Sequence, residues 1–229
     1  MSITHALPIT ESKPHFKHSA WGLPGGRVDF TDHPEITVRV AIFNGQNQLL
    51  LCLEKPKLII PNRPFQQTYR EYLDSLKSTV TQLRKRGNPL TWAEAKKVVE
   101  IYAPEIDAPF FDDCWNKKYT KKKILLTAIK EVLEETGYLI KPKLRERIQL
   151  QNNHRMTAIL TGIIVGGALL LQETQEIKLC RWFSQKNLPD IRGGSLDRGD
   201  GHFMYTTHHN RYLQIVLDSL KKKQNRPAV

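Results

Sequence analysis

The chain has 229 residues, 40% of them hydrophobic, which is enough for a packed core and argues against global disorder. A net charge of +12 and a pI near 9.6 favour an anionic partner such as a nucleotide, polyphosphate, RNA or acidic membrane surface; a solvated basic surface is the alternative. The three cysteines, Cys52, Cys114 and Cys180, form no Cys-x-x-Cys pair, which argues against a zinc knuckle and a disulfide framework.

Targeting signals are missing from the sequence as given. The first residues lack the basic-then-apolar run of a signal peptide. The longest apolar run, from Ile159 to Leu171, is too short to span a bilayer. We therefore expect a soluble, cytoplasmic protein with no membrane span and with reduced thiols.

The N-terminal third predicts mainly extended structure. Residues 1–34 are rich in Pro, His and Gly and indicate an arm or short strands. Two β-rich runs follow, over 36–43 and 48–53, and the Asn44-Gly45 pair between them is typical of a β-hairpin. Residues 57–61 predict a third strand.

The middle of the chain predicts helices. Apolar residues recur at helical spacing from 66 to 86, and a Gly-Asn-Pro sequence then breaks the pattern. A second helix begins at Thr91, because Glu94 three residues later completes a capping box. A third runs from about Lys122 to Thr136, with Gly137 as the residue that ends it.

Strands and a last helix complete the chain. We expect strands at 156–162, 168–171 and 176–183, and a helix at about 206–222. This order predicts an α/β (α+β) fold. Its expected parts are an N-terminal arm (1–34), a domain made of 35–64 and 124–229, and a helical insertion (65–123) within that domain.

The third helix carries the strongest chemical signal. Glu131, Glu134 and Glu135 are spaced so that they share one helix face. Carboxylates on a rigid helix suit Mg²⁺ or Mn²⁺, hard cations that prefer oxygen ligands and often bridge to phosphates. A solvated acidic face is the alternative.

Residues 130–137 resemble the second half of the Nudix box, Gly-x5-Glu-x7-Arg-Glu-U-x-Glu-Glu-x-Gly-U with U aliphatic. Downstream, Glu173-Thr174-Gln175-Glu176, then Trp182-Phe183 and Leu188-Pro189, resembles that family's Glu-x-x-Glu, strand, Trp-Phe and Leu-Pro segment. The resemblance covers about 36–62 and 124–220. It implies a Nudix-like α/β/α sandwich with a mixed sheet.

The same resemblance implies a Mg²⁺- or Mn²⁺-dependent pyrophosphohydrolase that acts on a nucleoside diphosphate-linked or related pyrophosphate substrate. Glu131 and Glu135 would be metal ligands, and Glu134 a further ligand or a base. Glu173 or Glu176 would supply the general base on a downstream loop. Lys130, at the family's arginine position, keeps the charge but loses the planar fork.

The first half of the box is not where the family has it. Counting back from Lys130, the box glycine falls on Asn116 and the early glutamate on Lys122. One carboxylate fewer leaves a second hypothesis, a catalytically inactive Nudix-fold module that binds a nucleotide or RNA.

A Trp-x-Leu-Pro-Gly-Gly sequence, which in the family leads directly into the box, stands instead at Trp21–Gly26. Either the arm folds back to rebuild the phosphate-side loop, or the match is an ordinary Pro-Gly turn. We favour the turn, because the first alternative needs an unusual chain path. Arg63 would then contact phosphate.

A polar, aromatic loop precedes the last helix, with the sequence Gly199-Asp200-Gly201-His202-Phe203-Met204-Tyr205 and then His208-His209. One hypothesis is a lid or base-stacking element with His202 or His208 near phosphate. The other, which we favour, is a loop that only leads into the helix.

Overall fold

The computed structural model describes residues 20–26, 35–55, 69–103, 117–149, 155–170, 173–174, 177–184 and 203–204. Most of the expected arm, the strand expected at 57–61 and the helix expected at 206–222 lie outside these ranges.

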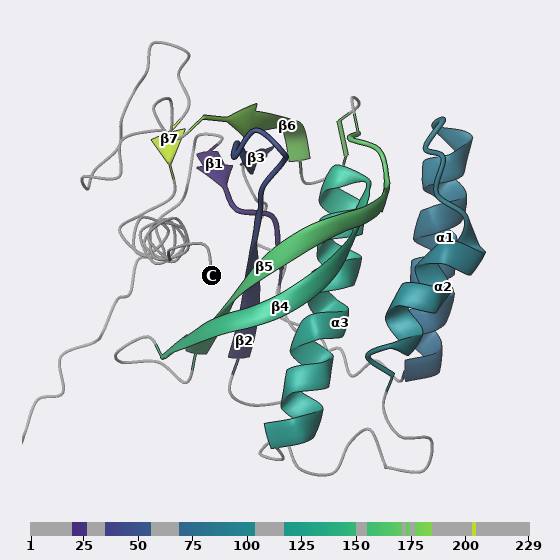
Figure 1. The fold of residues 1–229 in the computed structure, drawn as a ribbon, viewed down its shortest axis with the longest axis horizontal. Helices are drawn as coiled ribbons and strands as arrows, with labels where there is room; N and C mark the ends of the chain where they lie inside the picture. The colour runs from purple at the N-terminus through teal and green to yellow at the C-terminus, as the bar shows by residue number, and fades with distance from the viewer. Residues whose placement is uncertain are drawn as a thin grey trace, which may run out of the picture.

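Two small sheets form the β part of the fold (Figure 1). One is ordered β2 (Glu35–Ile42), β5 (Arg155–Gly167), β4 (Tyr138–Gln149), with β2 parallel and β4 antiparallel to β5. The other is ordered β6 (Ile177–Phe183), β3 (Leu49–Glu54), β1 (Ala20–Gly22), β7 (Phe203–Met204). Mixed sheets combined with helices make this an α+β fold, as expected.

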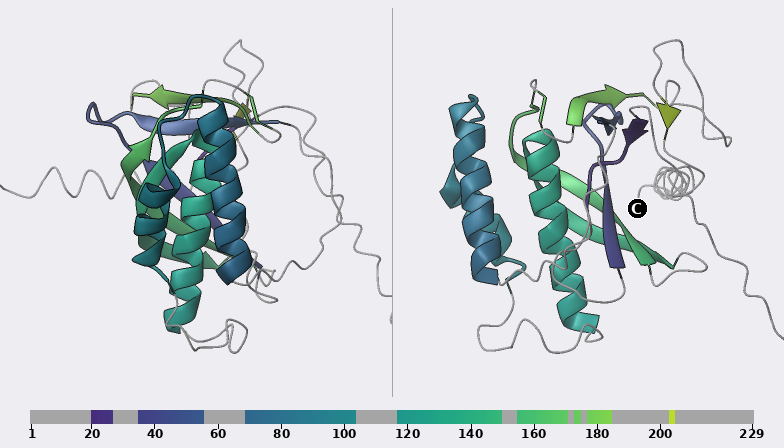
Figure 2. Two further views of the ribbon diagram at one scale, coloured as in Figure 1. Left: turned by 90° about the vertical axis from the view of Figure 1, so that its right-hand side faces the viewer. Right: turned by 180° about the vertical axis from the view of Figure 1, so that it is seen from behind.

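Three helices stand beside the β2–β5–β4 sheet (Figures 1 and 2). They are α1 (Tyr69–Lys85), α2 (Trp92–Glu100) and α3 (Lys117–Thr136). The helix α3 lies between the sheet and the α1–α2 pair. The capping box of Thr91 with Glu94 is confirmed, and so is the helix end at Gly137, whose φ is +79°.

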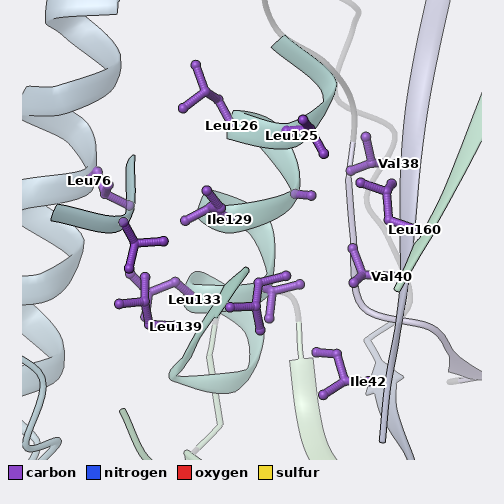
Figure 3. Packing of buried hydrophobic residues seen from close by; sticks show 14 of the residues in the cluster. Val38, Val40, Ile42, Leu76, Leu125, Leu126, Ile129, Leu133, Leu139 and Leu160 are labelled. Carbon is purple, nitrogen blue, oxygen red and sulfur yellow. The ribbon is translucent and has the colours of Figure 1, made fainter. Parts of the chain in front are cut away.

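Burial on two sides fixes α3 in place. Figure 3 shows Ile129 of α3 toward Leu76 of α1 and Leu133 near Leu139, while Leu125 lies toward Val38 and Leu160 of the sheet. These side chains belong to one core cluster and are almost fully buried. An α-helix with apolar residues on two faces is stable only when both faces are buried, here between the sheet and α1. This packing fixes the position of the acidic C-terminal end of α3.

The helix α1 is also held by a polar contact. The buried Tyr72 hydroxyl donates a hydrogen bond to the Leu126 carbonyl of α3 at 2.9 Å. The helices expected within 65–123 are therefore present: α1 packs on the helix that carries the glutamates, and α2 packs on α1 and β4.

The hairpin prediction holds at the turn but not along the strands. Phe43 pairs antiparallel with Leu49 as an isolated bridge, and Asn44 N–H donates to the Gln48 carbonyl at 3.1 Å. The turn contains Asn47 at φ +57°, a left-handed conformation that asparagine tolerates. Beyond this turn β2 and β3 lie in different sheets, so the chain reverses here and passes from one sheet to the other.

The strands after α3 are longer than expected. The strand β4, which was not among the expected strands, runs for 12 residues through Pro142 and a run of alternating basic residues. The separate strand expected at 168–171 is absent from the described residues 168–170, and β5 ends at Gly167. Among the described residues, no helix is both long enough and apolar enough to cross a membrane.

Disulfide formation between two buried cysteines tests the register of β3 against β6. Cys52 and Cys180 are directly paired across these strands, with their Sγ atoms 2.7 Å apart. Directly opposed residues in antiparallel strands have the Cα separation that a disulfide requires. Treatment with diamide should therefore join Cys52 to Cys180, slowly because both are buried. Peptide mapping by mass spectrometry would detect the product, and a disulfide joining Cys114 to either residue instead would contradict the register.

Candidate functional site

The Gly25–Gly26 loop lies against the acidic end of α3. After β1, the chain runs beside β2, where Val40 N–H donates to the Pro24 carbonyl at 2.9 Å and Val38 N–H to the Gly26 carbonyl at 2.8 Å. The Gly25 N–H donates to Oε2 of Glu135 at 2.9 Å, across 110 positions of sequence. The arm thus folds back onto the helix, and our preference for an ordinary turn is wrong.

Glu135 is a buried carboxylate, with 7% of its surface exposed. A buried charge must be compensated, and the bond from Gly25 N–H is charge-assisted and therefore of the stronger kind. The backbone at this position is also supported, since the Cys180 Sγ lies 3.4 Å from the Glu135 carbonyl, which it reaches as a donor. Glu135 is therefore fixed by the loop in front of it and by β6 behind it.

Glu131 packs against the second glycine of the loop. A Cβ atom added to Gly26 would overlap the Glu131 carboxylate, which would then have to turn away from the loop. Gly25 is more tightly constrained: its φ is +143°, and a Cβ there would overlap the Val38 backbone carbonyl. The close approach of loop and strand therefore requires glycine at Gly25, and the bare Gly26 leaves room for Glu131.

Arg39 fastens the loop from the other side. Its guanidinium Nη1 donates to the carbonyls of Leu23 at 3.3 Å and Gly25 at 3.0 Å. We did not single out Arg39 from the sequence. The available signal was a lone charged residue between the buried Val38 and Val40, because such a position demands a polar partner.

Glu134 points elsewhere. Its Oε1 accepts a hydrogen bond from the Thr79 hydroxyl of α1 at 3.0 Å, and its Oε2 lies 3.4 Å from Lys130 Nζ. Within the described ranges, no three His, Cys, Asp or Glu side chains gather closely enough to hold a metal ion. Glu131 and Glu135 therefore share the loop, while Glu134 faces the first helix.

The pKa of Tyr72 on α1 is raised, mainly by burial and in part by the acidic end of α3. Burial is the main cause that raises the pKa of Tyr72 well above its usual value; Tyr69 and the carboxylates of Glu134 and Glu131 add to it. The Tyr72 hydroxyl therefore stays protonated and remains a hydrogen-bond donor to α3.

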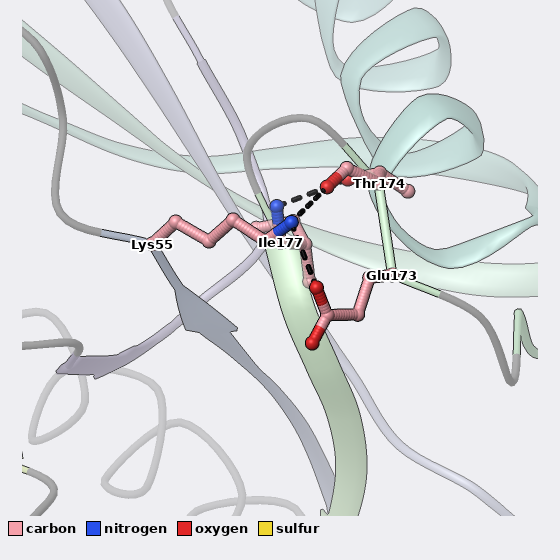
Figure 4. Close-up of polar contacts among 4 residues, drawn as sticks. All are labelled: Lys55, Glu173, Thr174 and Ile177. Atoms are coloured by element: carbon pink, nitrogen blue, oxygen red, sulfur yellow. Dashed lines mark hydrogen bonds and ion pairs between the residues drawn. The ribbon is translucent and has the colours of Figure 1, made fainter.

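The first downstream acidic candidate, Glu173, is held by Lys55. Glu173 Oε2 forms an ion pair with Lys55 Nζ at 2.9 Å, and the same Nζ donates to the Thr174 carbonyl at 2.7 Å (Figure 4). Ile177 N–H and the Thr174 hydroxyl close the turn at 3.0 Å. The other candidates, Glu176, Arg63 and His202, lie outside the described residues.

Lys122, at the position of the family's early glutamate, is used structurally. Its Nζ donates to the Ala103 carbonyl at 2.8 Å and so ties α3 to the end of α2.

Comparison with known proteins gave no match, either to a family model or to a curated protein.

The first glycine of the loop should be irreplaceable. In Gly25→Ala, the added methyl group would overlap the Val38 carbonyl, a backbone group that cannot turn away, at a φ of +143°, so we expect a loss of about 1–3 kcal/mol of unfolding free energy. Urea denaturation measures it. The control is Gly45→Ala, since a Cβ at Gly45 meets nothing within 4 Å and should cost less than about 0.5 kcal/mol. Equal stability of the two variants would contradict the contact.

Proposed function

We propose that the protein is a Nudix-type pyrophosphohydrolase that uses Mg²⁺ or Mn²⁺ and acts on an anionic nucleoside diphosphate-linked or related pyrophosphate. The observation that carries the proposal is the hydrogen bond from Gly25 N–H to Glu135 Oε2. It joins a Trp-x-Leu-Pro-Gly-Gly sequence to a Glu-x-x-Glu-Glu-x-Gly helix, two pieces that the family has next to each other in sequence. A chance resemblance of either piece would give no reason for their contact.

The contact also suggests where the first half of the box is. Counting forward from Gly26 with the Gly-x5-Glu spacing leads to Asp32, a carboxylate at the family's glutamate position. Asp32 lies outside the described residues, so this assignment rests on the spacing alone. In this proposal the box is split: one half lies in the N-terminal arm and the other on α3, with β2, β3, α1 and α2 between them in sequence.

The donor set suits a hard cation. Mg²⁺ is commonly held by one or two carboxylates together with water and substrate phosphates, so Glu131 and Glu135 are sufficient protein ligands. One helical turn before Glu131, Thr127 carries the one buried side-chain oxygen in the described chain that lacks a hydrogen-bond partner. A water or phosphate oxygen held beside Glu131 would satisfy that hydroxyl. The bound ion would neutralise phosphate charge and increase the acidity of the attacking water.

The residues of the chain supply the positioning. Gly25 N–H orients Glu135, the bare Gly26 lets Glu131 approach the loop, and Arg39 holds two loop carbonyls in place. A prearranged pair of carboxylates needs little reorganisation when a charged substrate binds. The net charge of +12 attracts such an anion over longer distances. The proton acceptor would be Glu173 or Glu176 on the downstream segment, because Glu134 is held on the α1 side.

A second candidate function is favoured by the position of Glu134. Its ties to Thr79 and Lys130 hold it on the α1 side, which leaves two carboxylates at the loop. A module with this arrangement would bind a nucleotide or RNA without hydrolysing it. The two functions differ in whether turnover occurs and whether it depends on the carboxylates.

The test is a hydrolysis screen of ADP-ribose, NADH, diadenosine polyphosphates, CoA and capped RNA with Mg²⁺ or Mn²⁺. We expect release of phosphate or a nucleoside monophosphate from at least one substrate. Glu135→Gln removes a charge from the metal site and should lower kcat by roughly 100-fold or more. Asp32→Asn should also lower kcat. Glu100→Gln and Asp74→Asn, at exposed positions on α2 and α1, are the matched controls and should leave the rate unchanged.

Two results of this screen would contradict the proposal. Inactivity across the whole panel, with ligand affinity retained in Glu135→Gln, would contradict the hydrolase and leave the binding module. Turnover that survives both Glu135→Gln and Glu131→Gln would contradict the assignment of the site.

A further inference from the structure

A basic groove lies at the opposite edge of the three-stranded sheet from the glycine loop. The loop borders β2, whereas β4 is the other outer strand in the order β2-β5-β4. The groove has a volume of about 450 Å³ and lies between β4, the first turns of α3 and the end of α2. This volume is within the range of pockets that bind small organic ligands.

Positive charge dominates the described lining. It contains Lys121, Lys143 and Arg145, and no acidic residue among the described ones. All three are exposed, and the structure shows no ion pair for Lys121 or Lys143 among the described residues. Arg145 is fixed on the sheet by the hydrogen bond from its Nε to the Thr161 hydroxyl at 2.8 Å. Three cations that line one hollow, with no acidic residue in its described lining, favour a phosphate group.

The rest of the lining is apolar. Leu125, Pro142 and Leu144 line the hollow together with the half-buried Tyr102. Burial raises the pKa of Tyr102, so the phenol is neutral, and its hydroxyl donates to the Pro142 carbonyl at 3.4 Å. Inorganic phosphate would make no favourable contact with these apolar side chains, whereas the flat face of a nucleobase would pack against them.

The edge of β4 is poorly suited to an acidic peptide. A peptide that adds a strand needs main-chain donors and acceptors along the edge. Pro142 has no N–H, and its carbonyl is already used by Tyr102. The groove therefore lacks the backbone groups that strand addition requires at its centre.

We propose that this groove binds a nucleotide unit, with its phosphate between Lys121, Lys143 and Arg145 and its base against Tyr102 and the apolar floor. The unit is either a free nucleotide or one residue of a single-stranded RNA, which present the same chemistry. The proposal does not depend on Glu131 or Glu135 and stands whether or not the protein is a hydrolase.

The test is fluorescence anisotropy with a short labelled single-stranded RNA, in EDTA and in the Glu135→Gln background so that no hydrolysis interferes. Lys121→Ala/Lys143→Ala should weaken binding about tenfold and flatten its salt dependence, because two phosphate contacts are lost. The control Lys77→Ala/Lys97→Ala removes the same charge from exposed positions on α1 and α2 and should change affinity less than about twofold.

The contact of the base with Tyr102 is tested separately. Tyr102→Ala should weaken binding at least about fivefold, while Tyr102→Phe keeps the ring and should bind nearly as well. Competition by free AMP or ADP supports a free nucleotide as the ligand; displacement only by unlabelled RNA supports the RNA chain.

Three results would overturn the proposal. One is equal weakening by the groove pair and the control pair, which would mean diffuse charge attraction. Another is competition by a polyglutamate peptide as strong as that by RNA. The last is absence of binding to both RNA and free nucleotides by the full chain.

Discussion

The hydrogen bond from Gly25 N–H to Glu135 Oε2 is the contact on which the candidate site depends. It closes a path of 110 positions and gives a buried carboxylate the donor that it needs. Because Gly25 and Gly26 carry no side chains, the loop can approach the Val38 carbonyl and the Glu131 carboxylate closely. The bond thus holds the glycine loop against the acidic end of α3.

The scaffold behind this contact is the doubly buried helix α3. It packs on the sheet through residues such as Leu125 and faces α1 through residues such as Ile129, so it cannot rotate without opening one of the two faces (Figure 3). Its C-terminal end then presents Glu131 and Glu135 to the loop, and its N-terminal turns present Lys121 to the groove beside β4. One rigid helix therefore serves an acidic site at one sheet edge and a basic one at the other.

Local patterns predicted what depends on local chemistry. The capping box at Thr91, the end of α3 at Gly137 and the apolar stripe of α1 were all correct, because caps and periodicity act within a few residues. The turn at Asn44-Gly45 formed, but the strands on either side of it do not pair beyond the Phe43–Leu49 bridge, because each pairs with distant partners in a separate sheet. The return of Gly25 to Glu135 was missed for the same reason: no local signal reports a contact between such distant positions. Roles assigned to Glu176, Arg63 and His202 stay predictions.

The central claim is that the N-terminal glycine loop and the α3 carboxylates form a single cation site. Paramagnetic broadening by Mn²⁺ in amide NMR spectra of the isotope-labelled protein tests it most directly, because broadening falls off steeply with distance from the ion. We predict that the amide signals of Gly25 and Gly26 broaden together with those of Glu131 and Glu135, and that excess Mg²⁺ or Glu135→Gln restores them. Broadening of the α3 signals while Gly25 and Gly26 stay sharp would contradict the claim.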